Sequence, residues 1–144
     1  MTTTPAPPSP LLHLDDVSVT YRRDGRDVPA VRRVDLTVAS GEIVGLAGES
    51  GCGKSTLAST ILRLQPASAQ ATGRVLVQGE DVLTMGWGAL RGLRWAGASI
   101  VFQGALHSLN PVHRIGRQIA EPIEIHEPEL GADQIEERVG DLLE

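Results

Sequence analysis

The sequence predicts an α/β fold in which a buried strand, a glycine-rich loop and a helix follow one another. Residues 42–47 form a mostly apolar run without alternation, as expected for a parallel strand that is covered on both faces. The glycine-rich loop occupies residues 48–56. After the loop, apolar residues recur near helical spacing until Pro66 ends the pattern. A strand, a loop and a helix in this order are the framework of a phosphate-binding site.

The loop matches the pattern G-x-x-x-x-G-K-[ST], which is typical of P-loops that bind nucleoside triphosphates. Its glycines let backbone N–H groups approach phosphate oxygens, and the following helix adds its positive dipole end. We expect Lys54 to reach the β- and γ-phosphates, Ser55 to join a Mg²⁺ shell and Thr56 to contact the α-phosphate. The predicted nucleotide-binding residues of the loop are Gly48, Glu49, Ser50, Gly51, Cys52, Gly53, Lys54, Ser55 and Thr56.

Two half-buried strands are predicted before the loop. Apolar residues alternate over residues 12–14 and again over residues 17–21, after a one-residue shift that indicates a bulge at residues 15–16. Residues 22–27 then predict a hairpin loop, and alternation over residues 34–38 predicts the second strand.

The segments after the loop predict further elements. Residues 73–79 indicate another strand of the antiparallel layer, and residues 98–102 indicate a second strand of the nucleotide-binding core. Residues 83–95 predict a helix, although the glycines in it disfavour one. The stretch from Ser108 to Pro111 is typical of a turn. Asp133 is predicted to cap a last helix with an apolar face, for which the sequence identifies no partner, made of Ile135, Val139, Leu142 and Leu143.

Length and composition limit the classes of protein that the chain can represent. Its 144 residues allow one domain with a core, and a formal net charge of −5 argues against nucleic-acid binding. Residues 1–10 predict a disordered tail without the features of a secretory signal. No apolar run approaches the roughly 20 residues that cross a bilayer. Cys52 is the only cysteine, so no internal disulfide forms, and a reducing compartment suits the chain.

These features resemble the ATP-binding subunits of ABC transporters, in particular those that serve di- and oligopeptide or nickel uptake. The resemblance rests on the loop GESGCGKST, the two strands before it, the hairpin-like residues 72–82, Tyr21, Gln103 and the segment 102–111 with its continuation to Gln118, Glu121 and Pro122. It covers about residues 11–144. It implies a P-loop NTPase fold of the ABC type, as the N-terminal half of a nucleotide-binding domain with an antiparallel β layer and the start of a helical subdomain.

The resemblance assigns roles to two residues outside the loop. It implies that Tyr21 lies against the adenine ring, although a half-buried tyrosine can also simply end a strand. It implies that Gln103 is a catalytic residue that touches Mg²⁺ or the attacking water, although a glutamine at the end of a strand can also be merely solvated. The expected cofactors are therefore ATP and Mg²⁺, with Ser55 and Gln103 as the metal-binding residues.

The resemblance also implies partners and a location. Residues 103–122 are expected to contact transmembrane permease subunits, and a second, identical or different ATP-binding subunit is expected to complete the assembly. A solute-binding protein would act only indirectly, and no nucleic-acid partner is expected. The implied location is peripheral, on the cytoplasmic face of the cell membrane.

The chain departs from the family in the motifs that follow residue 122. It contains no LSGGQ-like signature, no aliphatic run ending in Asp-Glu and no later switch histidine. By resemblance, the parent protein is an ABC-type ATPase that couples ATP hydrolysis to import, whereas this chain is expected to bind Mg-ATP without appreciable turnover. A small P-loop kinase is one alternative, disfavoured by the two strands before the loop and by the lack of an arginine-rich lid after residue 110. A non-catalytic nucleotide-binding or assembly module that docks through residues 103–122 is another.

Overall fold

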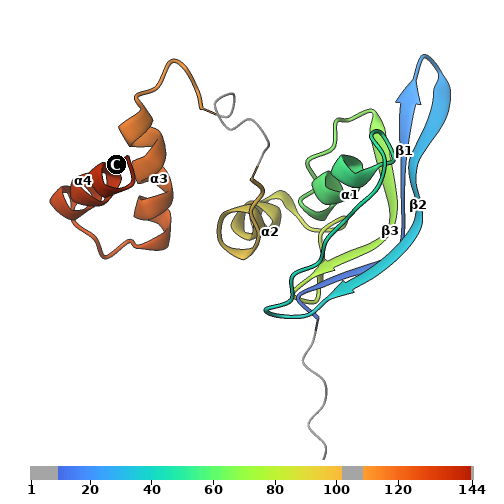
Figure 1. Ribbon diagram of the computed structural model, residues 1–144, viewed down its shortest axis with the longest axis horizontal. Helices are drawn as coiled ribbons and strands as arrows, with labels where there is room; N and C mark the ends of the chain where they lie inside the picture. The colour runs from blue at the N-terminus through green and yellow to red at the C-terminus, as the bar shows by residue number, and fades with distance from the viewer. Residues whose placement is uncertain (1–9, 102–108, 144) are drawn as a thin grey trace, which may run out of the picture. The chain divides into compact units, whose positions relative to one another are not determined.

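A computed structural model describes residues 10–101 and 109–143 of the chain (Figure 1). The chain divides into two compact units, Met1–Gly97 and Ala98–Glu144, which are described separately below. The first unit contains β1 (Leu12–Arg23), β2 (Arg26–Val38), α1 (Lys54–Ile61), β3 (Ala69–Val77), β4 (Glu80–Asp81), α2 (Trp87–Gly92) and the π-helical turn η1 (Leu93–Gly97). The second unit contains α3 (Ile115–His126) and α4 (Ala132–Asp141). Within the described residues, no helix is both long and apolar enough to cross a membrane.

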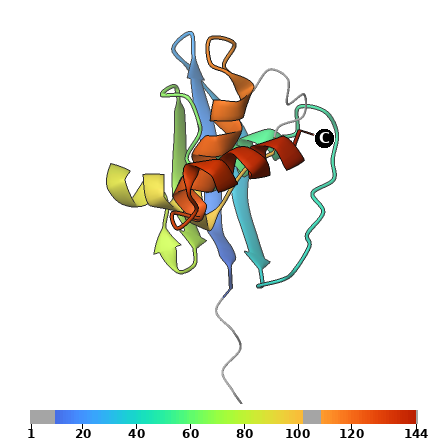
Figure 2. The ribbon, with the colours of Figure 1, turned by 90° about the vertical axis from the view of Figure 1, so that its left-hand side faces the viewer.

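The strands of the first unit form one antiparallel sheet in the order β2-β1-β3-β4. The predicted antiparallel layer is therefore confirmed, with β1 between its two long neighbours (Figures 1 and 2). β1 and β2 are joined by a tighter turn than the predicted loop over residues 22–27. Asp24 and Gly25 form this turn with φ angles of 51° and 72°, and such positive values at both central residues match the twist of a hairpin.

The predicted bulge in the first strand is also confirmed. The pairing of β1 shifts between Leu14 and Val17, and Asp16 adopts a positive φ of 48°. Arg33 of β2 and Gly73 of β3 have φ angles of 46° and 88° at the neighbouring positions of their strands. We call Arg33, Asp16 and Gly73 the bulge row. The Arg33 Nε donates a 2.9 Å hydrogen bond to Asp16 Oδ1, and this bond raises the pKa of Arg33.

The core of the first unit lies between one face of the sheet and the helices α1 and α2, which lie on the same side of the sheet (Figure 1). The bulge inserts one extra residue between Leu14 and Val17. Because of this insertion, the apolar side chains before and after the bulge point to the same face of the sheet, the face that carries the core. Leu57 of α1 and Leu90 of α2 are buried against the strands. The buried strand residues are Leu14, Val17, Val19, Val31, Val75 and Val77.

Two strands predicted for the nucleotide-binding core are absent from the described residues. Residues 42–47 form no strand, and Ile43 is 98% exposed; Figure 2 shows them within a long loop beside the sheet. Residues 98–101 also lack regular structure, and Phe102 lies outside the described residues. A parallel strand obtains its hydrogen bonds from neighbouring strands. No described strand pairs with either segment, so their apolar pattern alone does not produce a strand.

The boundaries of two other predicted elements differ from expectation. β3 begins earlier than predicted and ends at Val77, because Gln78 and Gly79 take positive φ angles of 52° and 86° and turn the chain into β4. The helix predicted over residues 83–95 begins only at Trp87. The residues before it form a turn in which the Leu83 N–H donates to Asp81 Oδ1 at 3.0 Å, and such a local side-chain acceptor competes with helix formation.

The second unit is a pair of packed helices after a turn. The predicted turn is confirmed for its described residues, where the Val112 N–H donates to Asn110 Oδ1 at 3.1 Å. α3 was not predicted, and it carries Pro122 in its interior. Part of the predicted apolar face is confirmed, because α4 packs against α3 with Val139 buried and Ile135 half-buried. Leu142 and Leu143 lie beyond the end of α4 and are 60% and 59% exposed, so they do not belong to this face.

The predicted cap of the last helix is wrong. Gly131, not Asp133, is the N-cap residue of α4, and Asp133 lies in the first helical turn. The Gln134 side chain accepts a 3.0 Å hydrogen bond from the Gly131 N–H, so a residue inside the helix satisfies the backbone at its start.

Candidate phosphate-binding site

The predicted loop leads directly into α1, and two glycines give it its conformation. Gly51 and Gly53 have φ angles of 79° and 100°, values that glycine adopts without strain. Gly53 is also the N-cap of α1, and a Cβ added to it would lie 2.4 Å from the Ala30 carbonyl oxygen of β2. The loop therefore passes against the edge strand so closely that only glycine fits at this position.

Lys54 ties the start of the loop to the start of the helix. Its Nζ donates hydrogen bonds to the carbonyl oxygens of Gly48 at 2.7 Å and Glu49 at 2.5 Å, and lies 3.5 Å from Cys52 Sγ. The ammonium group thus stands inside the curve of the loop. The sequence predicted a lysine that reaches phosphates, and the structure places its positive charge at the loop that would surround them.

The first turn of α1 offers unsatisfied donors next to this charge. The first backbone N–H groups of a helix have no partner within the helix, and they carry the positive end of its dipole. No acidic residue lies in the first turn of α1, and its N-cap Gly53 has no side chain that could accept from them. Ser55 is exposed in this turn. The helix start, the loop and Lys54 together can bind an anion.

Tyr21, which the resemblance places against the adenine ring, lies close to this helix start. The ring is half-buried near the end of β1, where Tyr21 pairs with Val28 of β2 and Ala69 of β3. Its Oη lies 3.2 Å from the Thr56 Oγ1 in the first turn of α1. The residues are 35 positions apart, and no sequence pattern pointed to this contact.

The remaining predicted site residue, Gln103, lies outside the described residues. Within residues 10–101 and 109–143, no group of three or more His, Cys, Asp or Glu side chains is arranged to hold a metal ion.

A cluster that the sequence did not reveal fixes the other end of α1. The Arg63 Nη1 donates to the carbonyl oxygens of three residues in the turn before α2, at 3.2, 3.3 and 2.8 Å. Arg94 donates to the carbonyl oxygens of Leu62 and Arg63, at 2.9 and 2.6 Å. Both guanidinium groups lie over the ring of Trp87, at 5.0 and 6.0 Å from its centroid. These contacts hold α1, and with it the phosphate loop, against α2.

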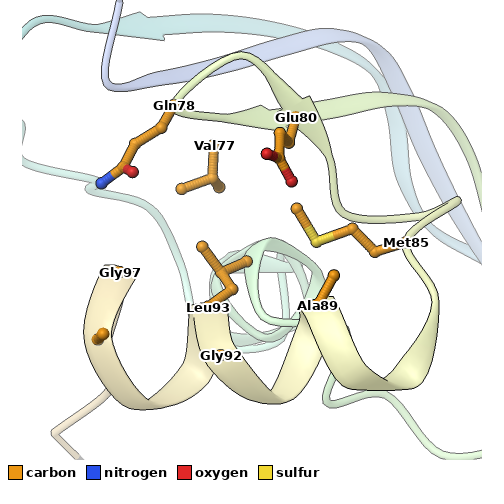
Figure 3. Close-up of a pocket in the computed structure, with 9 residues that line it drawn as sticks. Val77, Gln78, Glu80, Met85, Ala89, Gly92, Leu93 and Gly97 are labelled. Carbon is orange, nitrogen blue, oxygen red and sulfur yellow. The ribbon is translucent and has the colours of Figure 1, made fainter.

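Two cavities of the first unit differ in their relation to the loop. One, of about 460 Å³, lies between β2 and the loop and includes Cys52, Gly53 and Lys54 in its lining. The other, of about 300 Å³, lies between the β3–β4 hairpin and the helices α2 and η1, and Figure 3 shows Met85 and Leu93 pointing into it. The second cavity contains no residue of the loop, so we do not assign the nucleotide to it.

The sequence matches the family model described as "ABC transporter" over residues 31–143. It is 41% identical over 136 residues to an oligopeptide transport ATP-binding protein, OppD, of Mycobacterium tuberculosis, which covers 94% of this chain and 22% of that protein. It is 43% identical over 119 residues to a putative peptide import ATP-binding protein of Brucella abortus, covering 82% of this chain and 36% of that protein. The chain thus spans well under half the length of these relatives.

Solved structures support the fold. A dimeric structure of the bacterial ABC transporter cassette MJ0796 matches with a TM-score of 0.74 and 24% identity, over 88% of this chain and 53% of that one. A post-hydrolysis structure of the same cassette, bound to ADP and Pi, matches with a TM-score of 0.75 and 23% identity, over 90% of this chain and 54% of that one. At this identity the likeness shows the fold alone, and it confirms the predicted P-loop fold class.

Proposed function

The chain belongs to the ABC transporter family, and from this membership and the geometry of its loop we propose that it binds ATP with Mg²⁺ through residues 48–56. The observation that carries the proposal is the meeting of the Lys54 ammonium with the uncapped start of α1. A triphosphate is a polyanion, and at this loop a fixed cation and the N–H groups of a helix start converge.

Each residue of the loop has a task in this proposal. Lys54 exchanges one or both of its carbonyl contacts for oxygens of the β- and γ-phosphates, where a charge-assisted hydrogen bond is stronger. The exposed Ser55 hydroxyl supplies one ligand to Mg²⁺, which keeps several waters and binds few protein groups. Thr56 contacts the α-phosphate, and the Tyr21 ring stacks on the base. Bound Mg²⁺ neutralises the phosphate charge.

We also propose the wider role of the protein that contains this chain. It energises peptide import as the ATP-binding subunit of an ABC transporter, because the relatives above are named for oligopeptide transport and peptide import. We favour peptide over nickel as the cargo for the same reason. Residues 103–122 contact permease subunits, and a second ATP-binding subunit completes a dimer on the cytoplasmic face of the membrane. Gln103 reports the state of the nucleotide to the permease.

Hydrolysis requires groups beyond those of the loop. We propose that the 144 residues by themselves bind ATP without appreciable turnover, because their sequence has neither an LSGGQ-like signature nor an aliphatic run ending in Asp-Glu. The family match favours this function over a small-molecule kinase. Phosphoryl transfer to a small acceptor by the purified chain would reverse that preference.

A chemical property of the sequence gives a direct test of binding. Lys54 is the only lysine in the chain, so an amine-reactive acylating reagent has one side-chain target in it. We expect Mg-ATP to protect Lys54 from acylation, as measured by mass spectrometry of the peptide that contains it. Equal labelling with and without Mg-ATP, at nucleotide concentrations that saturate any binding, would contradict the proposal.

A pair of variants tests the role of the charge. Lys54→Met is expected to weaken Mg-ATP binding about 10- to 100-fold, because it removes hydrogen bonds from a charged donor. Arg33→Met is the matched control, since it also removes one positive charge but from an exposed residue that pairs with Asp16. Calorimetric titration of both variants should show the loss in Lys54→Met alone. Similar losses in both would attribute binding to net charge.

A further inference from the structure

The three hydroxyl side chains at positions 56, 59 and 60 of α1 make different contacts. The hydroxyls of Ser59 and Thr60 donate to helix carbonyl oxygens four residues earlier, each at 2.7 Å. Thr56 instead contacts the Tyr21 Oη of the neighbouring strand, at 3.2 Å. Thr56 is therefore the one of the three whose hydroxyl is linked to the sheet, and it lies in the turn that faces the proposed phosphate chain.

The chemistry of the two hydroxyls gives this contact a direction. A hydroxyl has one hydrogen to donate and two lone pairs that accept. A phenol O–H is a stronger hydrogen-bond donor than an aliphatic O–H, so we take the Tyr21 hydroxyl as the donor of the pair. When Tyr21 donates to Thr56 Oγ1, the hydrogen of Thr56 remains available for an anionic acceptor at the helix start.

The placement of Tyr21 makes it a firm anchor for this bond. Its backbone lies in β1, an inner strand of the sheet with pairing partners on both sides, and its ring is half-buried. Tyrosine also has few rotatable bonds, so little freedom is lost when its hydroxyl holds a second group. The sheet can thereby fix the orientation of a side chain in the phosphate-binding turn.

We propose that Tyr21 is a positioning residue for the phosphate chain: its hydroxyl orients Thr56 Oγ1 to donate to a phosphate oxygen. Tyr21 then contributes to phosphate binding independently of any stacking between its ring and the base. This inference rests on the proposed function, because it requires the loop to bind a nucleotide. It assigns separate tasks to two parts of one side chain, the ring for the base and the hydroxyl for the phosphates.

A comparison of two ligands on the intact protein separates these tasks. Mg-ATP has both a base and phosphates, whereas inorganic tripolyphosphate with Mg²⁺ has phosphates alone. Tyr21→Phe keeps the ring and removes only the hydroxyl. We expect it to weaken binding of both ligands by the same factor, about 3- to 10-fold, the usual effect of losing one hydrogen bond. Ser59→Ala, which removes a hydroxyl that does not face Tyr21, should leave both affinities unchanged.

A double-mutant cycle tests whether the hydroxyl acts through Thr56. Thr56→Val replaces its hydroxyl with a methyl group and should weaken binding at least as much as Tyr21→Phe. If the two hydroxyls act as one unit, the double variant binds no more weakly than Thr56→Val alone. If the affinity loss of the double variant equals the product of the two single-variant losses, the two hydroxyls act independently and the inference is overturned.

The remaining outcomes distinguish the inference from the function beneath it. If the unmodified protein binds both ligands and Tyr21→Phe affects ATP alone, or neither, the inference fails while nucleotide binding stands. If the unmodified protein binds neither ligand, the proposed function fails and the inference fails with it. Thermal unfolding of each variant excludes a general loss of structure as the cause of weakened binding, and Thr56→Val tests the same link without altering the sheet.

Discussion

Replacing Gly73 with alanine should destabilise the protein far more than its place in a strand suggests. Gly73 belongs to the bulge row and has a φ of 88°, which costs an ordinary residue roughly 1–2 kcal/mol. A Cβ on it would also lie 2.5 Å from the carbonyl oxygen of Asp16 and 2.6 Å from that of Asp15. These oxygens belong to β1, an inner strand of the sheet, which is paired on both sides and cannot easily move away. Overpacking of this kind adds about 1–3 kcal/mol.

Gly79→Ala is the matched control for this substitution. Gly79 has nearly the same backbone conformation, with a φ of 86°, but a Cβ there would meet no atom within 4 Å. Gly79→Ala should lower the free energy of unfolding only by the conformational cost of about 1–2 kcal/mol. Gly73→Ala should lower it by about 2–5 kcal/mol in total, because the steric cost is added. Urea denaturation followed by circular dichroism measures both losses. Equal losses in the two variants would refute the steric part of the reasoning.

Three further predictions concern other contacts. Arg63→Met should lower the free energy of unfolding by about 1.5–3 kcal/mol, because one charged group donates to three carbonyl oxygens. The control Arg22→Met breaks only an exposed ion pair and should lower the free energy of unfolding by less than about 1 kcal/mol. Similar shifts of the melting temperature in the two variants would contradict this prediction. Gln118→Ala removes hydrogen bonds to Asn110 and His113 and should accelerate tryptic cleavage after Arg114, and an unchanged rate would count against it. Pro122→Ala should stabilise α3 by up to about 3 kcal/mol, because a proline in a helix interior has no backbone N–H to donate. Unchanged helicity and an unchanged melting temperature, both measured by circular dichroism, would disprove this prediction.

The elements that the sequence predicted correctly carry their own local signals. Alternation marked the antiparallel strands, and the break in that alternation at residues 15–16 marked the bulge. The loop motif located the start of α1, because its glycines and its lysine have tasks that few other residues can perform. In each case the residues that decide the structure are close together in the sequence.

The errors concern features that depend on distant groups. The apolar run at residues 42–47 predicted a strand, but a strand also needs a partner, and none of the described strands pairs with it. α3 was not predicted, and Pro122 in its interior is a residue that normally breaks a helix. In the structure, α3 packs against α4, a contact that no local sequence pattern indicates. The contact between Tyr21 and Thr56 and the arginine cluster around Trp87 join residues that no local pattern connects.

The way the sheet is connected has a consequence for the order of events during synthesis. β1 and β2 are joined by a two-residue turn, and β3 and β4 complete the sheet by Asp81. β1 and β2 pair quickly, because little chain entropy is lost in closing a short loop, whereas β3 pairs with β1 across the long connection from Val38 to Ala69. All four strands are available on the ribosome once Asp81 has emerged, and none of them pairs with Ile43 and its apolar neighbours. At that stage the nascent chain would be a completed sheet with an apolar segment open to molecular chaperones.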